Sequence, residues 1–236
     1  VALGTVADMV SLDQHNRILV AAALRQNRNG HACAGIRALL QVADRDPAAL
    51  TTAELGFVVA PRINAAGRLE DMGLGIECLT TDDDAPALEL AHRLSAINAE
   101  RREIQSQMVE QAEAAVARWT GTHGEQALPC GVVLFEQEWH PGVVGLVASR
   151  LKEQLHRPVV ACAPAMDGSC EIRASLRSIR GVHARDILAE IDANEPGLIQ
   201  RFGGHAMAAG LTLARASLER FTSALAQTVQ RRAPPE

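Results

Sequence analysis

The longest repeat of apolar and polar positions covers residues 84–119, where apolar residues recur three, four or seven positions apart. This spacing is typical of an amphipathic helix, and at about 1.5 Å per residue the helix would be roughly 50 Å long. That length exceeds the diameter of one small domain, and the segment that follows contains both glycine and proline. We therefore expect the helix to connect two domains, with a cleft beside it.

Before this helix, the pattern predicts a helical layer preceded by one short strand. Helical spacing occurs near residues 14–28, 34–44 and 52–59. The apolar run at residues 1–7 is typical of a buried strand, and it ends at Asp8. Because the chain begins without methionine or a polar leader, we expect it to be cut from a longer protein.

After the long helix, strand patterns alternate with helical ones, which predicts an α/β domain. Short apolar runs near residues 131–135 and 158–162 predict two strands. In a third strand, Arg173, Ser175 and Arg177 alternate with apolar residues and therefore share one face. That face would be polar and basic.

Two further helices are expected, near residues 183–193 and 215–230. The pattern as a whole divides the chain into the end of a first domain at residues 1–83, a connecting helix at 84–120 and a second domain at 121–236. The fold class is therefore α/β, with a helical layer, a long helix and a smaller α/β domain.

Composition narrows the classes of protein that fit this pattern. The chain has 236 residues with 47% hydrophobic and 22% charged residues, and it contains no apolar run long enough to cross a bilayer. The five cysteines are scattered and lack Cys-x-x-Cys spacing, which argues against a disulfide framework or a structural zinc site and favours a reducing cytoplasm. A net charge of −5 argues against a uniformly basic surface, so any binding of nucleic acid needs a local basic groove.

The run Gly-Gly-His-Ala-Met-Ala-Ala-Gly at residues 203–210 is the strongest candidate for a binding site. Gly203 and Gly204 lack a Cβ, so backbone N–H groups could approach an anion there, and His205 offers a further donor. A phosphate is the natural ligand of such a site. The alternative is a tight turn that leads into a buried strand of small residues.

A second candidate is the block at residues 61–68, where a proline is expected to end a helix and start a loop. Arg62 and Arg68 offer forked donors for phosphate oxygens, and Asn64 could orient a neighbour. The alternative is that these arginines form surface ion pairs with nearby carboxylates.

Two other positions are candidates of lower specificity. Trp139 and His140 precede a helix, a location suited to anions, although a packed tryptophan and a capping histidine are equally compatible. Asp8 is a candidate metal ligand at the end of the first strand, and its alternative role is to cap the next helix. The three aspartates at 82–84 are expected to form an acidic first helical turn and to have no chemical role. We expect the candidate blocks to converge on one site.

Six blocks of the sequence resemble those of the RecJ family of bacterial single-strand-specific DNA exonucleases, and they occur in the same order. This family belongs to the DHH phosphoesterase superfamily. The blocks lie at residues 4–8, 61–68, 98–103, 139–151, 175–179 and 203–210. The resemblance implies the end of a DHH catalytic domain, a long connecting helix and a DHH-associated substrate-binding domain.

The resemblance also implies roles for the candidate residues in 5′-to-3′ hydrolysis of single-stranded DNA. Two Mn²⁺ or Mg²⁺ ions would generate the attacking hydroxide, with Asp8 as a catalytic metal ligand. The first-domain block would hold the DNA backbone, and the second domain would reach the terminal 5′ phosphate. The implied DNA-binding residues are Arg62, Asn64, Arg68, Trp139, His140, Ser175, Arg177, Ser178, Gly203, Gly204 and His205. A single-strand-binding protein or a helicase is an implied partner.

The chain departs from the family pattern in ways that limit these implications. The Asp-x-Asp and Asp-His-His metal motifs and the downstream OB-type domain are missing from the sequence, so we expect this chain alone to be inactive. Leu176 and Ala174 stand where the family has smaller residues, which puts close backbone approach there in doubt. Two alternatives stay open: a DHH phosphodiesterase that acts on short oligonucleotides or cyclic dinucleotides, and a non-catalytic module that binds nucleic acid.

Overall fold

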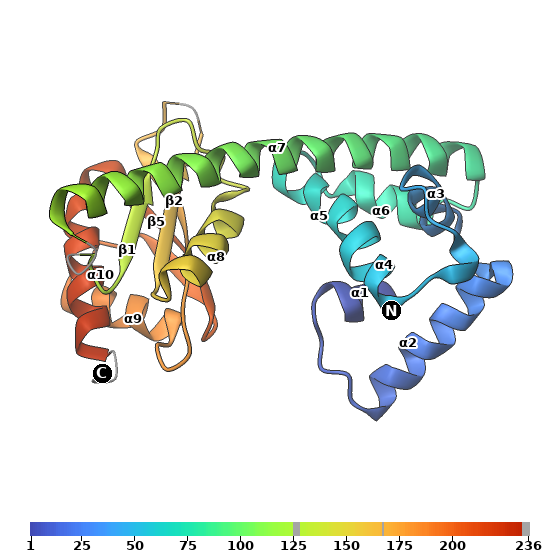
Figure 1. Cartoon of the computed structure of the whole chain (residues 1–236), viewed down its shortest axis with the longest axis horizontal. Coiled ribbons are helices and arrows are strands. Elements are labelled where there is room, and N and C mark those ends of the chain that lie inside the picture. Colours follow the sequence, from blue (N-terminus) through green and yellow to red (C-terminus); the bar gives the residue numbers. More distant parts are fainter. Residues whose placement is uncertain (125–127, 167, 233–236) are drawn as a thin grey trace. The chain divides into compact units, whose positions relative to one another are not determined.

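The computed structural model describes residues 1–124, 128–166 and 168–232, and these form two compact units (Figure 1). Unit 1 comprises Val1–Glu103 and unit 2 comprises Ile104–Glu236. The boundary lies inside helix α7 (Asp84–His123), which has 40 residues and is about 60 Å long. The predicted long helix is therefore present, and each unit contains part of it. None of the described helices is long and apolar enough to span a membrane.

Unit 1 is helical throughout its described elements. Its helices before α7 are α1 (Ala2–Ala7), α2 (Gln14–Gln26), η1 (Asn27–His31), α3 (Ala34–Val42), η2 (Pro47–Ala49), α4 (Thr52–Glu54), η3 (Leu55–Val59), α5 (Ala60–Leu69) and α6 (Gly73–Thr80). Their buried side chains form one core with the first part of α7, in which Leu39, Leu40, Val59 and Leu94 are completely buried. The predicted helical layer is confirmed.

Two predicted elements of unit 1 are wrong. Residues 1–7 form helix α1 rather than a strand, with Ala2 and Thr5 buried one helical turn apart. An apolar run this short does not distinguish a strand from a helix, because both can be buried on most sides. Residues 61–68 form helix α5 rather than a loop, with Pro61 in its first turn.

The helix continues into Pro61 because the turn before it has π-type hydrogen bonding. In η3 the backbone N–H of Ala60 donates to the carbonyl of Leu55, five residues earlier. This wider turn shifts the hydrogen-bond ladder ahead of the proline, and a proline in the first turn of a helix loses no bond that the helix would otherwise make.

Unit 2 is a five-stranded sheet with helices on both faces. The strands are β1 (Val132–Phe135), β2 (Val159–Pro164), β3 (Glu171–Arg177), β4 (Arg201–Gly204) and β5 (Ala208–Ala214). Their order across the sheet is β1-β2-β3-β5-β4, and only the β1/β2 pair is parallel. The remaining elements are α8 (Val144–Leu155), α9 (Ala184–Asn194), η5 (Arg215–Ser217) and α10 (Leu218–Arg232). The α/β domain and its expected helices are thus present.

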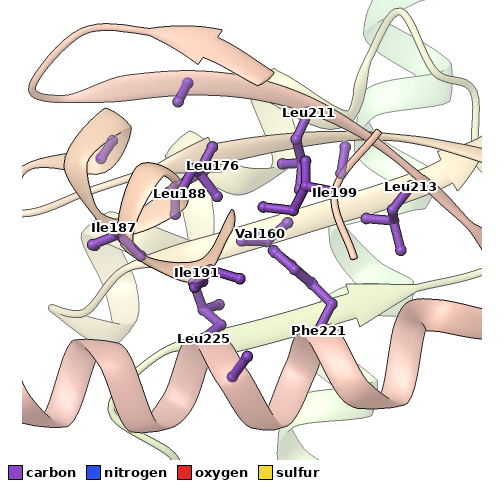
Figure 2. Close-up of a cluster of buried hydrophobic side chains, with 14 of the residues drawn as sticks. Val160, Leu176, Ile187, Leu188, Ile191, Ile199, Leu211, Leu213, Phe221 and Leu225 are labelled. Atoms are coloured by element: carbon purple, nitrogen blue, oxygen red, sulfur yellow. The ribbon is translucent and has the colours of Figure 1, made fainter. Parts of the chain in front are cut away.

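The two faces of the sheet differ in how much of them is covered. Helices α9 and α10 pack over one face, where side chains from β2, β3 and β5 meet Ile191 and Phe221 (Figure 2). Helix α8 packs against β2 and β3 on the other face. On that second face Gly203 and Gly210, from β4 and β5, are exposed. An open strip of sheet therefore remains beside α8.

Candidate nucleic-acid interface

The glycine-rich motif forms the hairpin that joins β4 to β5. The His205 N–H donates to the carbonyl of Ala208 over 2.8 Å, and the His205 side chain is exposed. Gly204 has φ of 152°, and a Cβ there would lie 2.4 Å from both the Ala208 oxygen and the Ala209 Cα. Only glycine fits this position. The tight turn is therefore present, and it carries the predicted phosphate-binding residues at its tip and along its edge.

Strand register brings the glycines beside Ser175. Ser175 on β3 pairs with Gly210 on β5, which pairs in turn with Gly203 on β4. The three residues form a row across the open strip of the sheet. Because Gly210 and Gly203 have no side chain, their backbone atoms are exposed and accessible to a ligand. These two blocks were expected from the sequence to converge, and the register of the strands accounts for their proximity.

Arg177 lies between this row and α8. Its Nε donates to the Ser149 hydroxyl over 3.1 Å, and its Nη1 donates to the Ser175 hydroxyl over 2.5 Å and to the Leu176 carbonyl over 3.1 Å. A Cβ at Gly145 would lie 2.8 Å from Nη2 of Arg177, so the absence of a side chain there lets the guanidinium lie against the first turn of α8. The predicted proximity of Ser175 and Arg177 is confirmed. A guanidinium beside a helix N-terminus makes this spot electropositive.

The other residues of this strand face away from the strip or are buried. Ala174 and Leu176 belong to the core beneath α9 and α10, so their sizes do not obstruct the glycine row. Ser178 was predicted to contact phosphate, but it is only 1% exposed and its hydroxyl donates to the Val182 carbonyl over 2.5 Å. Its described contacts are those of a residue that holds the turn after β3, because its hydroxyl does not reach the surface.

The described contacts of Trp139 and His140 match their structural alternatives. Trp139 is 3% exposed, and its indole N–H donates to Oε1 of Gln111 on α7 over 2.8 Å. His140 is half-buried, and its Nδ1 accepts from the Gly142 N–H over 3.1 Å. A packed tryptophan and a loop-bracing histidine account for these contacts. Their contact with nucleic acid stays a prediction.

In unit 1, the candidate arginines lie on helix α5. Nε of Arg62 donates to the Ser95 hydroxyl over 3.3 Å and its Nη1 donates to the Val58 carbonyl over 2.7 Å. Burial, followed by the neighbouring Arg102 and Arg45, lowers the pKa of Arg62, and burial lowers the pKa of Arg68. Glu70, a carboxylate close to Arg68 in the sequence, forms an ion pair with Arg93 over 2.8 Å.

Asn64 is exposed on the same helix. Because the block is helical, Asn64 and Arg68 are one turn apart and lie on one side of α5. Their contact with the DNA backbone remains a prediction.

Arg101 and Arg102 on α7 were given no role from the sequence, but they lie near the candidate arginines of α5. Arg101 on α7 donates through Nη2 to Oδ1 of the buried Asn98 over 2.8 Å. Burial, then Arg68 and Arg102, lowers the pKa of Arg101. The available signal was the Arg101-Arg102 pair inside the block at 98–103, which lies in the helix that was expected to connect two domains.

Asp8 is exposed at the C-terminal end of α1, and its N–H donates to the Gly4 carbonyl over 3.0 Å. It does not cap the next helix, because the side chain of Asp13 occupies that role by accepting from the Asn16 N–H. Within the described ranges, no group of three or more His, Cys, Asp or Glu residues could hold a metal ion. Asp8 and α5 belong to unit 1 and the glycine motif to unit 2, so their convergence stays a prediction.

Comparison with known proteins first identifies the class of domain to which unit 2 belongs. Residues 128–231, which include the whole sheet of unit 2, match the DHHA1 domain. Over 229 residues the chain is 48% identical to the single-stranded-DNA-specific exonuclease RecJ of Dickeya dadantii and 46% identical to that of Escherichia coli. The chain belongs to the RecJ family. These alignments cover 97% of the chain but 39% of each relative.

Solved structures agree with this assignment. The structure of RecJ in complex with Mg²⁺ from Thermus thermophilus matches 98% of the chain and 33% of its own length, with a TM-score of 0.80 and 32% identity. The Mn²⁺ complex from the same organism has a TM-score of 0.81 with 30% identity, covering 99% of the chain and 32% of its own. The predicted fold class and family are therefore confirmed.

Proposed function

We propose that this chain is part of a metal-dependent 5′-to-3′ exonuclease acting on single-stranded DNA, and that unit 2 binds the 5′-terminal phosphate. The observation that carries the proposal is the Arg177 guanidinium, which Ser149 and Ser175 hold beside the first turn of α8. The row formed by Ser175, Gly210 and Gly203, with its exposed backbone, lies next to this guanidinium. This combination offers a fixed charge, hydroxyl donors and accessible backbone to one anion.

The residues of this site suit a terminal phosphate better than an internal one. A terminal monoester carries more negative charge than a diester, and a guanidinium fork binds it through charge-assisted hydrogen bonds. Ser175 can reorient its hydroxyl toward the same oxygen atoms, and the exposed His205 lies at the tip of the neighbouring hairpin. In unit 1, the arginines of α5 and α7 would hold the backbone of the strand. The site would therefore select a 5′ end and set the direction of digestion.

The metal ions that family members carry would activate water for attack on the phosphodiester when bound. The candidate ligand Asp8 is exposed, and among the residues that the structure describes no group of three or more His, Cys, Asp or Glu residues could hold a metal ion. Asp8 would thus be a single ligand among others that the chain does not supply.

The test compares two arginine variants in a longer RecJ-family protein that contains this chain. Arg177→Ala should reduce the preference for 5′-phosphorylated over 5′-hydroxyl single strands by about 1.5 to 3 kcal/mol, the range for a charged hydrogen bond. Cleavage rates of both substrates are measured at fixed salt, because phosphate affinities depend on ionic strength.

Arg220→Ala is the matched control. Its side chain is 71% exposed on α10, where it forms an ion pair with Glu195, and the loss of such a surface pair has little effect. Equal weakening of both substrates by Arg177→Ala would show a general backbone contact and would overturn the assignment of end recognition.

A further inference from the structure

A second row of polar side chains crosses the open strip of the sheet, one step along the strands from the glycine row. Arg173 on β3 pairs with Thr212 on β5, which pairs with Arg201 on β4. Both arginines are exposed and Thr212 is half-buried. Neither arginine was assigned a role by the sequence or by the proposed site.

Strand alternation places both arginines on the same face as the glycine row. Arg173 lies between the buried residues Ile172 and Ala174, so its side chain points away from the core, as that of Ser175 does. Arg201 precedes Phe202, which packs against the core, and therefore shares the open side with Gly203. The two guanidiniums flank Thr212 across three neighbouring strands, about 10 Å apart at their backbones.

The charges of these two arginines are not balanced locally. Among the residues that the structure describes, neither guanidinium takes part in an ion pair. The carboxylate that shares this face of β3 is Glu171, one step further from the glycine row and opposite Ala214. Two like charges on either side of a threonine hydroxyl attract an anion, since an anion between them relieves their repulsion.

The spacing of the two rows suits consecutive phosphates of an extended strand. A step of two residues along β3 is about 6.8 Å, so an anion at Thr212 would lie one such step from an anion at Ser175. Consecutive phosphates of an extended single strand are separated by a similar distance. In the first row, the absence of side chains at Gly203 and Gly210 leaves room beside the first phosphate for the sugar that follows it.

We infer that Arg173, Thr212 and Arg201 bind the second phosphate of a single strand whose 5′-terminal phosphate is held at Ser175 and Arg177. This inference rests on the proposed function, because it takes the first phosphate position from it. Glu171 occupies the next row, and its negative charge repels a third phosphate there. The sheet of unit 2 would thus bind two phosphates, and the strand would leave its surface after them.

The experiment measures binding of the 236-residue chain to 5′-phosphorylated thymidine mono-, di- and trinucleotides by calorimetry. We expect the dinucleotide to bind about tenfold more tightly than the mononucleotide, and the trinucleotide to add little. In the Arg173→Ala, Arg201→Ala double variant the gain from the second nucleotide should vanish, with mononucleotide affinity retained. The slope of log affinity against log salt for the dinucleotide should decrease by about 0.7, as for one lost phosphate contact on a single strand.

Two further variants separate charge from structure. Arg173→Lys with Arg201→Lys keeps both charges and should preserve most of the dinucleotide gain, whereas Arg220→Ala on α10 should change nothing. Circular dichroism melts of each variant verify that the exposed substitutions leave the fold intact.

The outcomes distinguish the inference from the function on which it rests. If the wild-type chain binds the mononucleotide but gains nothing from the second nucleotide, the second position does not exist and the first remains. If the double variant weakens mono- and dinucleotide equally, the arginines act only as general charge and the inference is overturned. If the wild type binds neither ligand, the phosphate site at Arg177 fails, and the second position fails with it.

Discussion

At Gly204 the backbone of the hairpin leaves no space for a side chain. A Cβ would lie 2.4 Å from the Ala208 oxygen, and φ of 152° is strained for any other residue. Gly204→Ala should therefore lower the free energy of unfolding by about 2 to 4 kcal/mol, measured by urea denaturation. Gly203→Ala is the control, because a Cβ there meets nothing within 4 Å. Equal stability of the two variants would show that the hairpin relaxes without cost.

The buried thiol of Cys78 makes the stability of unit 1 sensitive to alkaline pH. Burial, and to a lesser extent Cys33, raises the pKa of Cys78 from 9.0 to about 11. The folded state favours the neutral thiol, so this contribution is fully present below pH 9 and is lost as the pH rises toward 11. We expect a loss of about 2 to 3 kcal/mol over this range, measured by denaturation at several pH values. Cys78→Ala should flatten this dependence, and an unchanged slope would contradict the assignment.

At the scale of elements, helix α8 contacts strand β3 at the proposed phosphate site. Gly145 faces the Arg177 guanidinium, and an added Cβ would lie 2.8 Å from Nη2. Because the obstructed atom is at the end of a flexible side chain, Gly145→Ala should shift Arg177 with little loss of stability. Mononucleotide affinity should decrease about threefold to tenfold, measured by calorimetry alongside a thermal melt. Unchanged affinity would mean that Arg177 need not lie against α8 to bind.

The sequence predicted those elements whose periodicity is long or strictly alternating. The 40-residue α7 and the alternation of β3 follow directly from spacing. The first helix was mistaken for a strand because six residues hold too few repeats, and α5 for a loop because the π-type turn before Pro61 leaves no clear sequence signal.

The residues of the candidate site and their convergence were predicted, but the contacts that bring them together in unit 2 were not. Alternation alone placed Ser175 beside Arg177. Register between strands placed Gly210 and Gly203 next to Ser175, and packing placed Gly145 against Arg177. Register and packing depend on contacts between residues far apart in the chain. These contacts cannot be read from the spacing of residues in a single sequence.

For the molecule as a whole, we predict that the 236-residue chain does not release nucleotides from single-stranded DNA in the presence of Mn²⁺. One carboxylate cannot hold two divalent ions, and the described residues contain no group of three or more His, Cys, Asp or Glu residues that could hold a metal ion with Asp8. In a longer RecJ-family protein that contains the chain, Asp8→Asn should lower turnover by orders of magnitude and leave stability nearly unchanged. Robust activity of the purified chain would contradict the predicted inactivity, and near-normal turnover of the variant at saturating Mn²⁺ would remove Asp8 from the metal site.

Because α7 contributes to both units, its two halves gain their packing partners at different times during synthesis. Leu94 packs in a core whose other helices are made before α7. Gln111 and Glu113 instead accept hydrogen bonds from Trp139 and Gln154, which leave the ribosome later. Most of the stability of a helix in a protein comes from packing against other elements rather than from its own propensity. The second half of α7 therefore becomes stable only when unit 2 is made, whereas unit 1 can fold first.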